Sequence, residues 1–275
     1  MSIIEAIIIG IVQGISEFLP VSSTAHIIIT QMLFNVSFPG LGFEVFLHLA
    51  SIFAVIIYYR KDLLDIITGF FGFFQNKTKE NKVQFLFAIY LVVATGITGV
   101  LGLLLEGFIG DSLKTPSFIA FALAITGIFL IIIERFYKYG VRKEENMTFL
   151  DSIIIGLVQT LAVFPGISRS GSTLIAGLFA GLSKETAVRF SFLLSIPVIL
   201  GSSVLTIGDF VDGSLVETIG LLPLVVAFIT TFVCSWLGIL WLIDFLKRSK
   251  LVYFAYYCFA LALFVFFFLE GNAVL

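Results

Sequence analysis

Two stretches of this sequence resemble each other, IEAIIIGIVQGISEF at residues 4–18 and LDSIIIGLVQTLAVF at residues 150–164. They share IIIG, VQ and a final Phe at a constant offset. Each apolar run is broken early, by Pro20 or by Pro165-Gly166, and a Ser/Gly/Thr-rich stretch and a second short apolar run (27–34 and 174–182) follow. Short apolar halves around a polar break are typical of re-entrant hairpins, whose irregular backbone lines a cavity instead of facing lipid. The two stretches therefore predict an internal repeat of hairpins; the alternative is a chance match between two isoleucine-rich segments.

The composition around these stretches is that of a polytopic membrane protein. Of the 275 residues, 59% are hydrophobic and 12% are charged, whereas soluble domains are about 45–50% apolar and about 25% charged. A spanning helix needs about 20 apolar residues, and six segments are candidates, at 43–59, 84–105, 117–134, 186–207, 219–243 and 251–269. The net charge of −2 gives no indication of nucleic-acid binding, and Cys234 and Cys258 form no CxxC motif.

These segments predict an all-α fold in a single integral membrane domain over residues 1–275. We expect each half to hold one re-entrant helix hairpin and three transmembrane helices, with repeat one at about 1–135 and repeat two at about 149–270. A hairpin returns to its own side and three spans are an odd number, so the second half begins on the opposite side of the membrane from the first. The prediction is an inverted-topology repeat, a plan found in secondary transporters.

The charged loops assign a direction to this plan. Lys and Arg gather at 60–82, 135–143 and 247–250, whereas the loops 106–116 and 208–218 hold one lysine and several acids. By the positive-inside rule the first group is cytoplasmic, so the first hairpin enters from outside and the second from the cytoplasm. We expect a multi-pass protein of the plasma membrane whose site opens to the external face. The stretch 60–82, aromatic between basic ends, is expected to lie in the membrane interface.

Polar side chains surround the proline break of the first hairpin. Gln13 and Glu17 stand four residues apart and share one face of a helix, which Pro20 ends. The next helix opens with SSTAH, whose hydroxyls suit a helix cap. The candidate site residues of this hairpin are Gln13, Glu17, Ser22, Ser23, Thr24 and His26.

The second hairpin places an arginine where charge is costly. The stretch FPGISRSGST at 164–173 sets Arg169 among serines and glycines, although an arginine inside the membrane costs about 2.5–3.5 kcal/mol on insertion scales. Free N–H groups at a helix start, hydroxyls and a fork-shaped guanidinium suit phosphate oxygens. The candidates are Ser168, Arg169, Ser170, Gly171 and Thr173. The alternative for Arg169 is an ion pair with a buried carboxylate such as Glu17.

A second acid and histidine stand four residues apart near the outer end of the first expected span. Glu44 and His48 either extend the site as a second pair of metal ligands or make a plain i,i+4 contact on their helix.

The stretches FLPVSSTAH and PGISRSGST resemble the two signature motifs of the undecaprenyl-diphosphate phosphatases, also called the bacitracin-resistance BacA family. Members hydrolyse the diphosphate of a long-chain lipid carrier to the monophosphate, which recycles the carrier for cell-envelope synthesis. The resemblance implies Glu17 and His26 as essential groups with Ser23 and Thr24 beside them, Arg169 as the phosphate clamp between Ser168 and Ser170, and a divalent cation such as Mg²⁺ or Ca²⁺.

Two positions depart from the pattern of that family. Gln13 stands where many members carry a second glutamate, which removes one candidate metal ligand. Ala25 replaces the glycine that usually precedes the histidine and adds a methyl group where backbone approaches the ligand.

The residue types suggest how hydrolysis would proceed. Arg169 and the 168–173 amides would hold the phosphoryl oxygens, a cation bound through Glu17 would neutralise charge, and His26 would act as general base or proton donor. The nucleophile is either a water molecule or Ser23 activated by His26. The expected partners are a polyprenyl diphosphate, the lipid bilayer and, as a candidate assembly, a second copy of the chain.

Two other functions compete with hydrolysis. The repeat plan by itself suits a polyprenyl-phosphate flippase or another transporter of anionic lipids equally well, although an anion carrier has less need of an imidazole beside a carboxylate. STAH and SR also suggest a type 2 phosphatidic acid phosphatase, but that family requires a second histidine motif, and His48 is misplaced for it.

Overall fold

The structure, a computed structural model, is all-helical in the residues it describes, which are 1–36, 42–106, 113–137, 139–206, 208, 212–248 and 250–269. The helices of the first half are α1 (Ile3–Ser16), α2 (Ser23–Phe34), α3 (Gly42–Tyr58), α4 (Arg60–Gln75), α5 (Lys79–Glu106) and α6 (Pro116–Phe136). Those of the second half are η2 (Glu144–Asn146), α7 (Phe149–Thr160), η3 (Leu161–Val163), α8 (Arg169–Phe179), α9 (Lys184–Leu205), α11 (Ser214–Ile219), α12 (Leu221–Arg248) and α13 (Val252–Phe268).

Four of these helices, α5, α6, α9 and α12, are long and apolar enough to cross a membrane. They correspond to four of the six expected spans. The expected span 43–59 is α3, which meets α4 at a bend of 75°, so that the pair forms either a broken span or a re-entrant loop. The sixth, 251–269, is the 17-residue helix α13. The protein is therefore an all-α polytopic membrane protein.

The two stretches that resemble each other form matching local structures. Ser2 and Glu5 make a capping box at the start of α1, and Thr148 and Asp151 make one at the start of α7. Each helix then ends at its break, and a short second helix follows, α2 or α8. At the breaks, Ser22 has φ 67° and Gly166 has φ 94°. The local fold thus agrees with two short-helix hairpins, whereas their insertion from opposite sides of a membrane stays a prediction.

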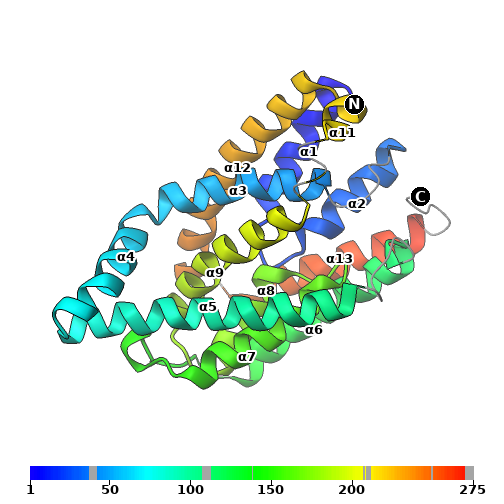
Figure 1. The fold of residues 1–275 in the computed structure, drawn as a ribbon. Helices are drawn as coiled ribbons and strands as arrows, with labels where there is room; N and C mark the ends of the chain where they lie inside the picture. Colours follow the sequence, from blue (N-terminus) through cyan, green and yellow to red (C-terminus); the bar gives the residue numbers. More distant parts are fainter. Residues whose placement is uncertain are drawn as a thin grey trace.

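Helix packing also pairs the two halves. In Figure 1, α1 runs beside α12 and α7 runs beside α5. Glycines at equivalent places allow these approaches, because a Cβ on Gly10 would lie 2.9 Å from the carbonyl oxygen of Ala227, and one on Gly156 would lie 2.9 Å from that of Ala94. The first helix of each hairpin thus packs on a long helix of the other half.

Candidate active site

The breaks of the two hairpins touch each other inside the helical bundle. The Ser170 hydroxyl, at the start of α8, donates to the carbonyl oxygen of Leu19 in the first break at 2.8 Å. A Cβ on Gly171 would lie 3.3 Å from the Pro20 Cβ, so glycine is what lets α8 come this close. The side chains around the two breaks therefore belong to one site.

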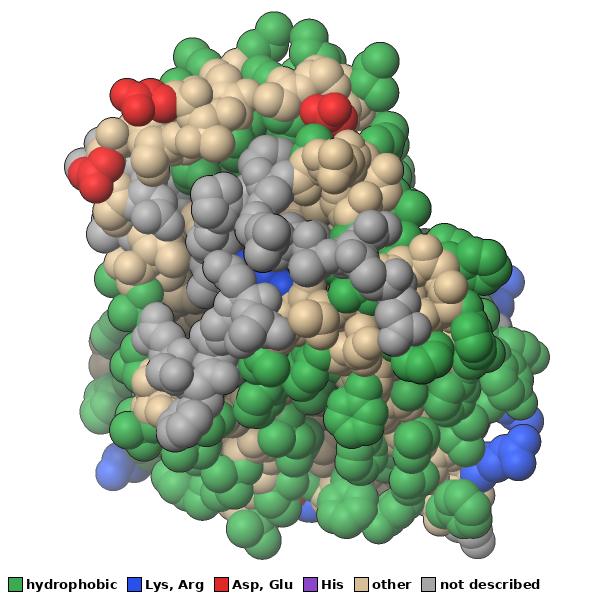
Figure 2. All heavy atoms as spheres, turned by 90° about the vertical axis from the view of Figure 1, so that its right-hand side faces the viewer, with side chains coloured by type: hydrophobic (Ala, Val, Ile, Leu, Met, Phe, Trp, Pro, Cys, Tyr) green, Lys and Arg blue, Asp and Glu red, His purple; other side chains and the backbone are tan. Residues whose placement is uncertain are grey.

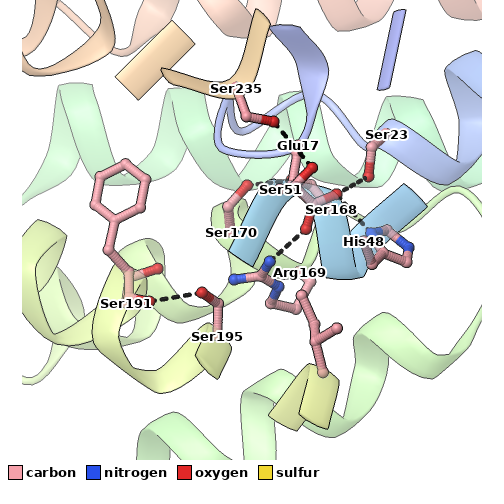
Figure 3. Close-up of polar contacts among 12 residues, drawn as sticks. Glu17, Ser23, His48, Ser51, Ser168, Arg169, Ser170, Ser191, Ser195 and Ser235 are labelled. Atoms are coloured by element: carbon pink, nitrogen blue, oxygen red, sulfur yellow. Dashed lines mark hydrogen bonds and ion pairs between the residues drawn. The ribbon is translucent and has the colours of Figure 1, made fainter. Parts of the chain in front are cut away.

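Glu17 is the centre of this site (Figure 3), and its side chain is almost fully buried. Its Oε2 accepts hydrogen bonds from the Ser23 hydroxyl at 2.7 Å and from the Gln13 amide at 2.8 Å. Its Oε1 accepts one from Arg169 Nη2 at 2.5 Å. The four-residue spacing of Gln13 and Glu17 on α1 produces the contact between their side chains. The turn at Pro20 brings Ser23 back to the carboxylate.

Arg169 reaches Glu17 from the first turn of α8. Ser168 caps this helix, accepting from the Gly171 N–H at 3.0 Å. The guanidinium uses Nη2 on Glu17, whereas its Nη1 is buried and has no hydrogen-bond partner among the described residues. Leaving a buried charged donor without a partner is costly. The free Nη1 marks where an anionic ligand would bind.

His48 of α3 is the second titratable partner of Glu17. Its Nδ1 lies 2.9 Å from Glu17 Oε2 and 2.8 Å from Gln13 Nε2. One ring nitrogen either donates to the carboxylate or accepts from the amide, so the tautomer of His48 selects between the two contacts. The sequence suggested His48 only as half of a pair with Glu44, which lies one turn earlier and forms an ion pair of 3.9 Å with Lys114.

His26 lies in a different environment from the one that the sequence suggested. Its Nδ1 is 2.7 Å from the Ser22 carbonyl oxygen, and its Nε2 is 2.7 Å from the hydroxyl of Tyr257 on α13, whose ring stacks on the imidazole. With both ring nitrogens engaged in this way, His26 makes no hydrogen bond to Glu17 or Ser23 in the described structure. It instead holds the turn in which Ser22 has a positive φ.

The remaining predicted residues mainly shape the backbone around the break. Ser22 caps α2 by accepting from the Ala25 N–H at 3.3 Å, and the Ser168 and Ser170 hydroxyls are 3.3 Å apart. Thr173 contacts the Ser191 hydroxyl of α9 and the carbonyl oxygen of Arg169. For Thr24, half-buried in the same turn, the described structure gives no side-chain hydrogen bond.

The oxygen atoms of Glu17 and Gln13 are the candidate ligands of the expected divalent cation. No group of three or more His, Cys, Asp or Glu residues that could hold a metal ion occurs in the described ranges. Gln13 Oε1, however, is buried without a hydrogen-bond partner among the described residues, next to the Glu17 carboxylate. Mg²⁺ typically binds through one or two carboxylates together with water and substrate phosphates. A carboxylate and a free amide oxygen fit that pattern only if a phosphate supplies further ligands.

Comparison with known proteins places the chain in one family. A family model described as bacitracin resistance protein BacA matches residues 6–264. The chain is 72% identical to undecaprenyl-diphosphatase 2 of Halalkalibacterium halodurans, over 99% of this chain and 98% of that protein. It is 61% identical to undecaprenyl-diphosphatase 1 of Shouchella clausii over 98% of both chains, and 41% identical to the undecaprenyl-diphosphatase of Oceanobacillus iheyensis over 98% and 97%.

Proposed function

This chain belongs to the bacitracin resistance protein BacA family, and from that premise we propose that the Glu17–Arg169 site is where it hydrolyses undecaprenyl diphosphate to the monophosphate and inorganic phosphate. The chain is an undecaprenyl-diphosphatase, a membrane hydrolase. The observation that carries the location of the reaction is the contact between Arg169 and Glu17. It joins a phosphate-binding cation of one hairpin to a proton acceptor of the other.

Arg169 binds the phosphoryl group that is transferred. Its Nη1, which is buried without a hydrogen-bond partner among the described residues, is left to donate to a phosphoryl oxygen while Nη2 contacts Glu17. Because phosphoryl transfer spreads charge over the equatorial oxygens, a fixed guanidinium in a site of low dielectric stabilises the transition state.

Ser23 is the nucleophile in this proposal, and Glu17 accepts its proton. The Ser23 hydroxyl already donates to Glu17 Oε2 at 2.7 Å, so its proton has an acceptor. The new bond joins Ser23 Oγ to the terminal phosphorus, and the bond from that phosphorus to the bridging oxygen breaks, which releases the lipid monophosphate. A water molecule then attacks the phosphorus of the phosphoserine, the bond from that phosphorus to Ser23 Oγ breaks, and Glu17 returns its proton to Ser23 Oγ as phosphate is released. Glu17, not His26, is the base nearest to Ser23.

His48 and Gln13 keep the carboxylate in place during these steps, since both contact Glu17 Oε2. Glu17 and Gln13 Oε1 would hold the divalent cation, Mg²⁺ or Ca²⁺. When bound, such a cation neutralises the charge that develops on the diphosphate. His26 acts through the backbone, since its ring holds the carbonyl of Ser22, the residue before Ser23.

We place the site in the plasma membrane, open to the external face. The support is the distribution of charge along the molecule. The basic stretch 60–82 forms α4 and the start of α5, at the left of Figure 1. The start of α1 and the helix α11 lie toward the right of that view. Seen from that right-hand end, Figure 2 shows Asp and Glu side chains in its upper part, whereas most of the Lys and Arg side chains in view lie at the left and right margins. The positive-inside rule makes the end seen in Figure 2 external.

Phosphate release from undecaprenyl diphosphate by the purified protein, with Mg²⁺ present, tests the function. We expect turnover by the wild type, none by Ser23→Ala, and a phosphoserine trapped after acid quench of the wild type. If Ser23→Ala retains turnover, the nucleophile is water. Transport of the lipid across sealed vesicles without release of phosphate would replace hydrolysis by the flippase function.

A further inference from the structure

An apolar cavity of about 290 Å³ lies between α6, α7 and α8, on one side of the second hairpin. Hydrocarbon side chains from all three helices form its walls, among them Phe129, Ile132, Ile154, Val158, Ile175 and Phe179. Thr126 and Ser172 are the polar residues in this lining. The cavity therefore suits a hydrocarbon group and has little to offer a polar one.

The polar end of this cavity adjoins the Glu17–Arg169 site. Ser172 lies one turn after Arg169 on α8, and Thr126 accepts a hydrogen bond from the backbone N–H of Ser168, the cap of that helix, at 3.5 Å. Ile167, the residue before the cap, also lines the cavity. The space therefore begins where the second break ends, beside the residues that would hold the phosphate.

The cavity then runs along α8 away from the break. From Ser172 to Phe179 the helix rises by roughly 10 Å. Phe179 lies at the end of α8 that leads into the basic start of α9 at Lys184. A lipid of the external leaflet whose head group binds at Arg169 would point its chain in this direction, toward the interior of the bilayer. The position of the cavity thus matches the chain of an amphiphile whose head group is bound at Arg169.

We propose that the cavity between α6, α7 and α8 binds the isoprene units next to the diphosphate of the lipid substrate. The proposal rests on the proposed function. Membrane hydrocarbon is as apolar as these walls, so burial alone gives no preference for the isoprenoid chain over other lipid. The cavity acts by packing against the chain and by aligning the diphosphate with Arg169 and Ser23, which contributes to the rate as orientation does.

Substrates of two chain lengths test this assignment. Val158→Trp fills the cavity from α7, whereas Leu157→Trp puts the same ring on the exposed side of the same helix. We expect Val158→Trp to lower kcat/KM for undecaprenyl diphosphate about tenfold relative to dimethylallyl diphosphate, whose single isoprene unit leaves most of the cavity empty, a factor worth about 1.4 kcal/mol. Leu157→Trp should leave the ratio between the two substrates unchanged. Retained turnover of the short substrate shows that the variant is folded.

The outcomes separate this proposal from the function on which it rests. No phosphate release by the wild type from either substrate would contradict the function itself. A wild-type ratio in Val158→Trp, with both substrates turned over, would overturn the chain site alone. If Val158→Trp loses both activities, Ile132→Trp on the opposite wall decides, and an unchanged ratio there overturns the proposal. Equal shifts of the ratio in Val158→Trp and Leu157→Trp would also overturn it, because they would assign the effect to surrounding lipid.

Discussion

The guanidinium of Arg169 lies 2.5 Å from the carboxylate of Glu17, although 152 residues separate them in the sequence. Each residue sits at the break of its own short-helix hairpin, and both side chains are largely buried. Breaking a buried ion pair by removing one partner leaves an uncompensated charge, at a cost of about 3–5 kcal/mol. The pair therefore couples the two halves of the chain in stability as well as in chemistry.

Replacing the proton acceptor while keeping its size should stop the reaction. In Glu17→Gln the side chain still fills its place, but it no longer takes the proton of Ser23. We expect kcat to fall by about 10²–10⁴, the usual contribution of a general base. The rate of phosphate release measures kcat, and Glu217→Gln on the short surface helix α11 is the control that should behave as wild type. Near-normal turnover in Glu17→Gln would remove this residue from the chemistry.

The shape of the cation at position 169 should matter as much as its charge. Arg169→Lys keeps one positive charge but loses the fork that contacts Glu17 with one nitrogen and leaves the other for phosphate. We expect kcat/KM to fall by about 10–100-fold, the equivalent of one charged hydrogen bond. Arg248→Lys, whose exposed pair with Asp244 lies at the end of α12, should behave as wild type. Equal effects of the two substitutions would contradict the assigned role.

The close approach of the hairpins depends on a glycine. A Cβ at Gly171 would lie 3.0 Å from Ser168 Cβ and 3.3 Å from Pro20 Cβ, so in Gly171→Ala these neighbours must move by a few tenths of an ångström. We expect a lower melting temperature and lower activity, with about 1–3 kcal/mol of strain from overpacking. Gly96→Ala on α5, where a Cβ meets nothing within 4 Å, should leave activity unchanged and stabilise the helix by up to about 1 kcal/mol. The opposite ranking in a thermal melt would show that the breaks are not in contact.

Removal of divalent cations should abolish activity, and Mg²⁺ or Ca²⁺ should restore it. The two repeats supply a matched pair of variants, because Gln13 and Gln159 are both buried with an Oε1 that has no hydrogen-bond partner among the described residues. Gln13 lies beside Glu17, whereas Gln159 donates to Thr98. We expect Gln13→Leu to raise the Mg²⁺ concentration for half-maximal activity about tenfold, in line with the loss of a metal-site contact. An equal increase in Gln159→Leu would exclude Gln13 as a ligand.

Much of the fold follows from local sequence. Four long apolar runs predict α5, α6, α9 and α12, and the two breaks predict the hairpins. The expected span 43–59 and the expected interfacial stretch 60–82 imply a change of direction between them, and α3 meets α4 there at 75°. The angle itself was not predicted, because no proline or glycine marks the bend. The start of the expected span 219–243 also differs from the structure. Gly220 has φ 94° and separates α11, which ends at Ile219, from α12, which begins at Leu221.

Some contacts of the site likewise follow from local sequence, whereas others depend on tertiary packing. Spacing brings Gln13 to Glu17, and the matching hairpins made Arg169 a candidate partner of that carboxylate. The contacts of His48 with Glu17 and of Tyr257 with His26 come from α3 and α13, which reach the hairpins only through tertiary packing. Because histidine and tyrosine are also common in plain helical segments, no local pattern separates these two from structural residues. The contact of Ser23 with Glu17 depends on the geometry of the turn at Pro20, which residue types alone do not give.

A double-mutant cycle on phosphate release from undecaprenyl diphosphate tests the central claim most directly, with Glu17→Ala, Arg169→Ala and the double variant measured beside the wild type. Residues that act as one unit are strongly non-additive. We predict that each single change nearly abolishes turnover and that the double variant is no slower than the slower single one. Losses that multiply, as they do for distant and independent sites, would contradict a single site shared by the two hairpins.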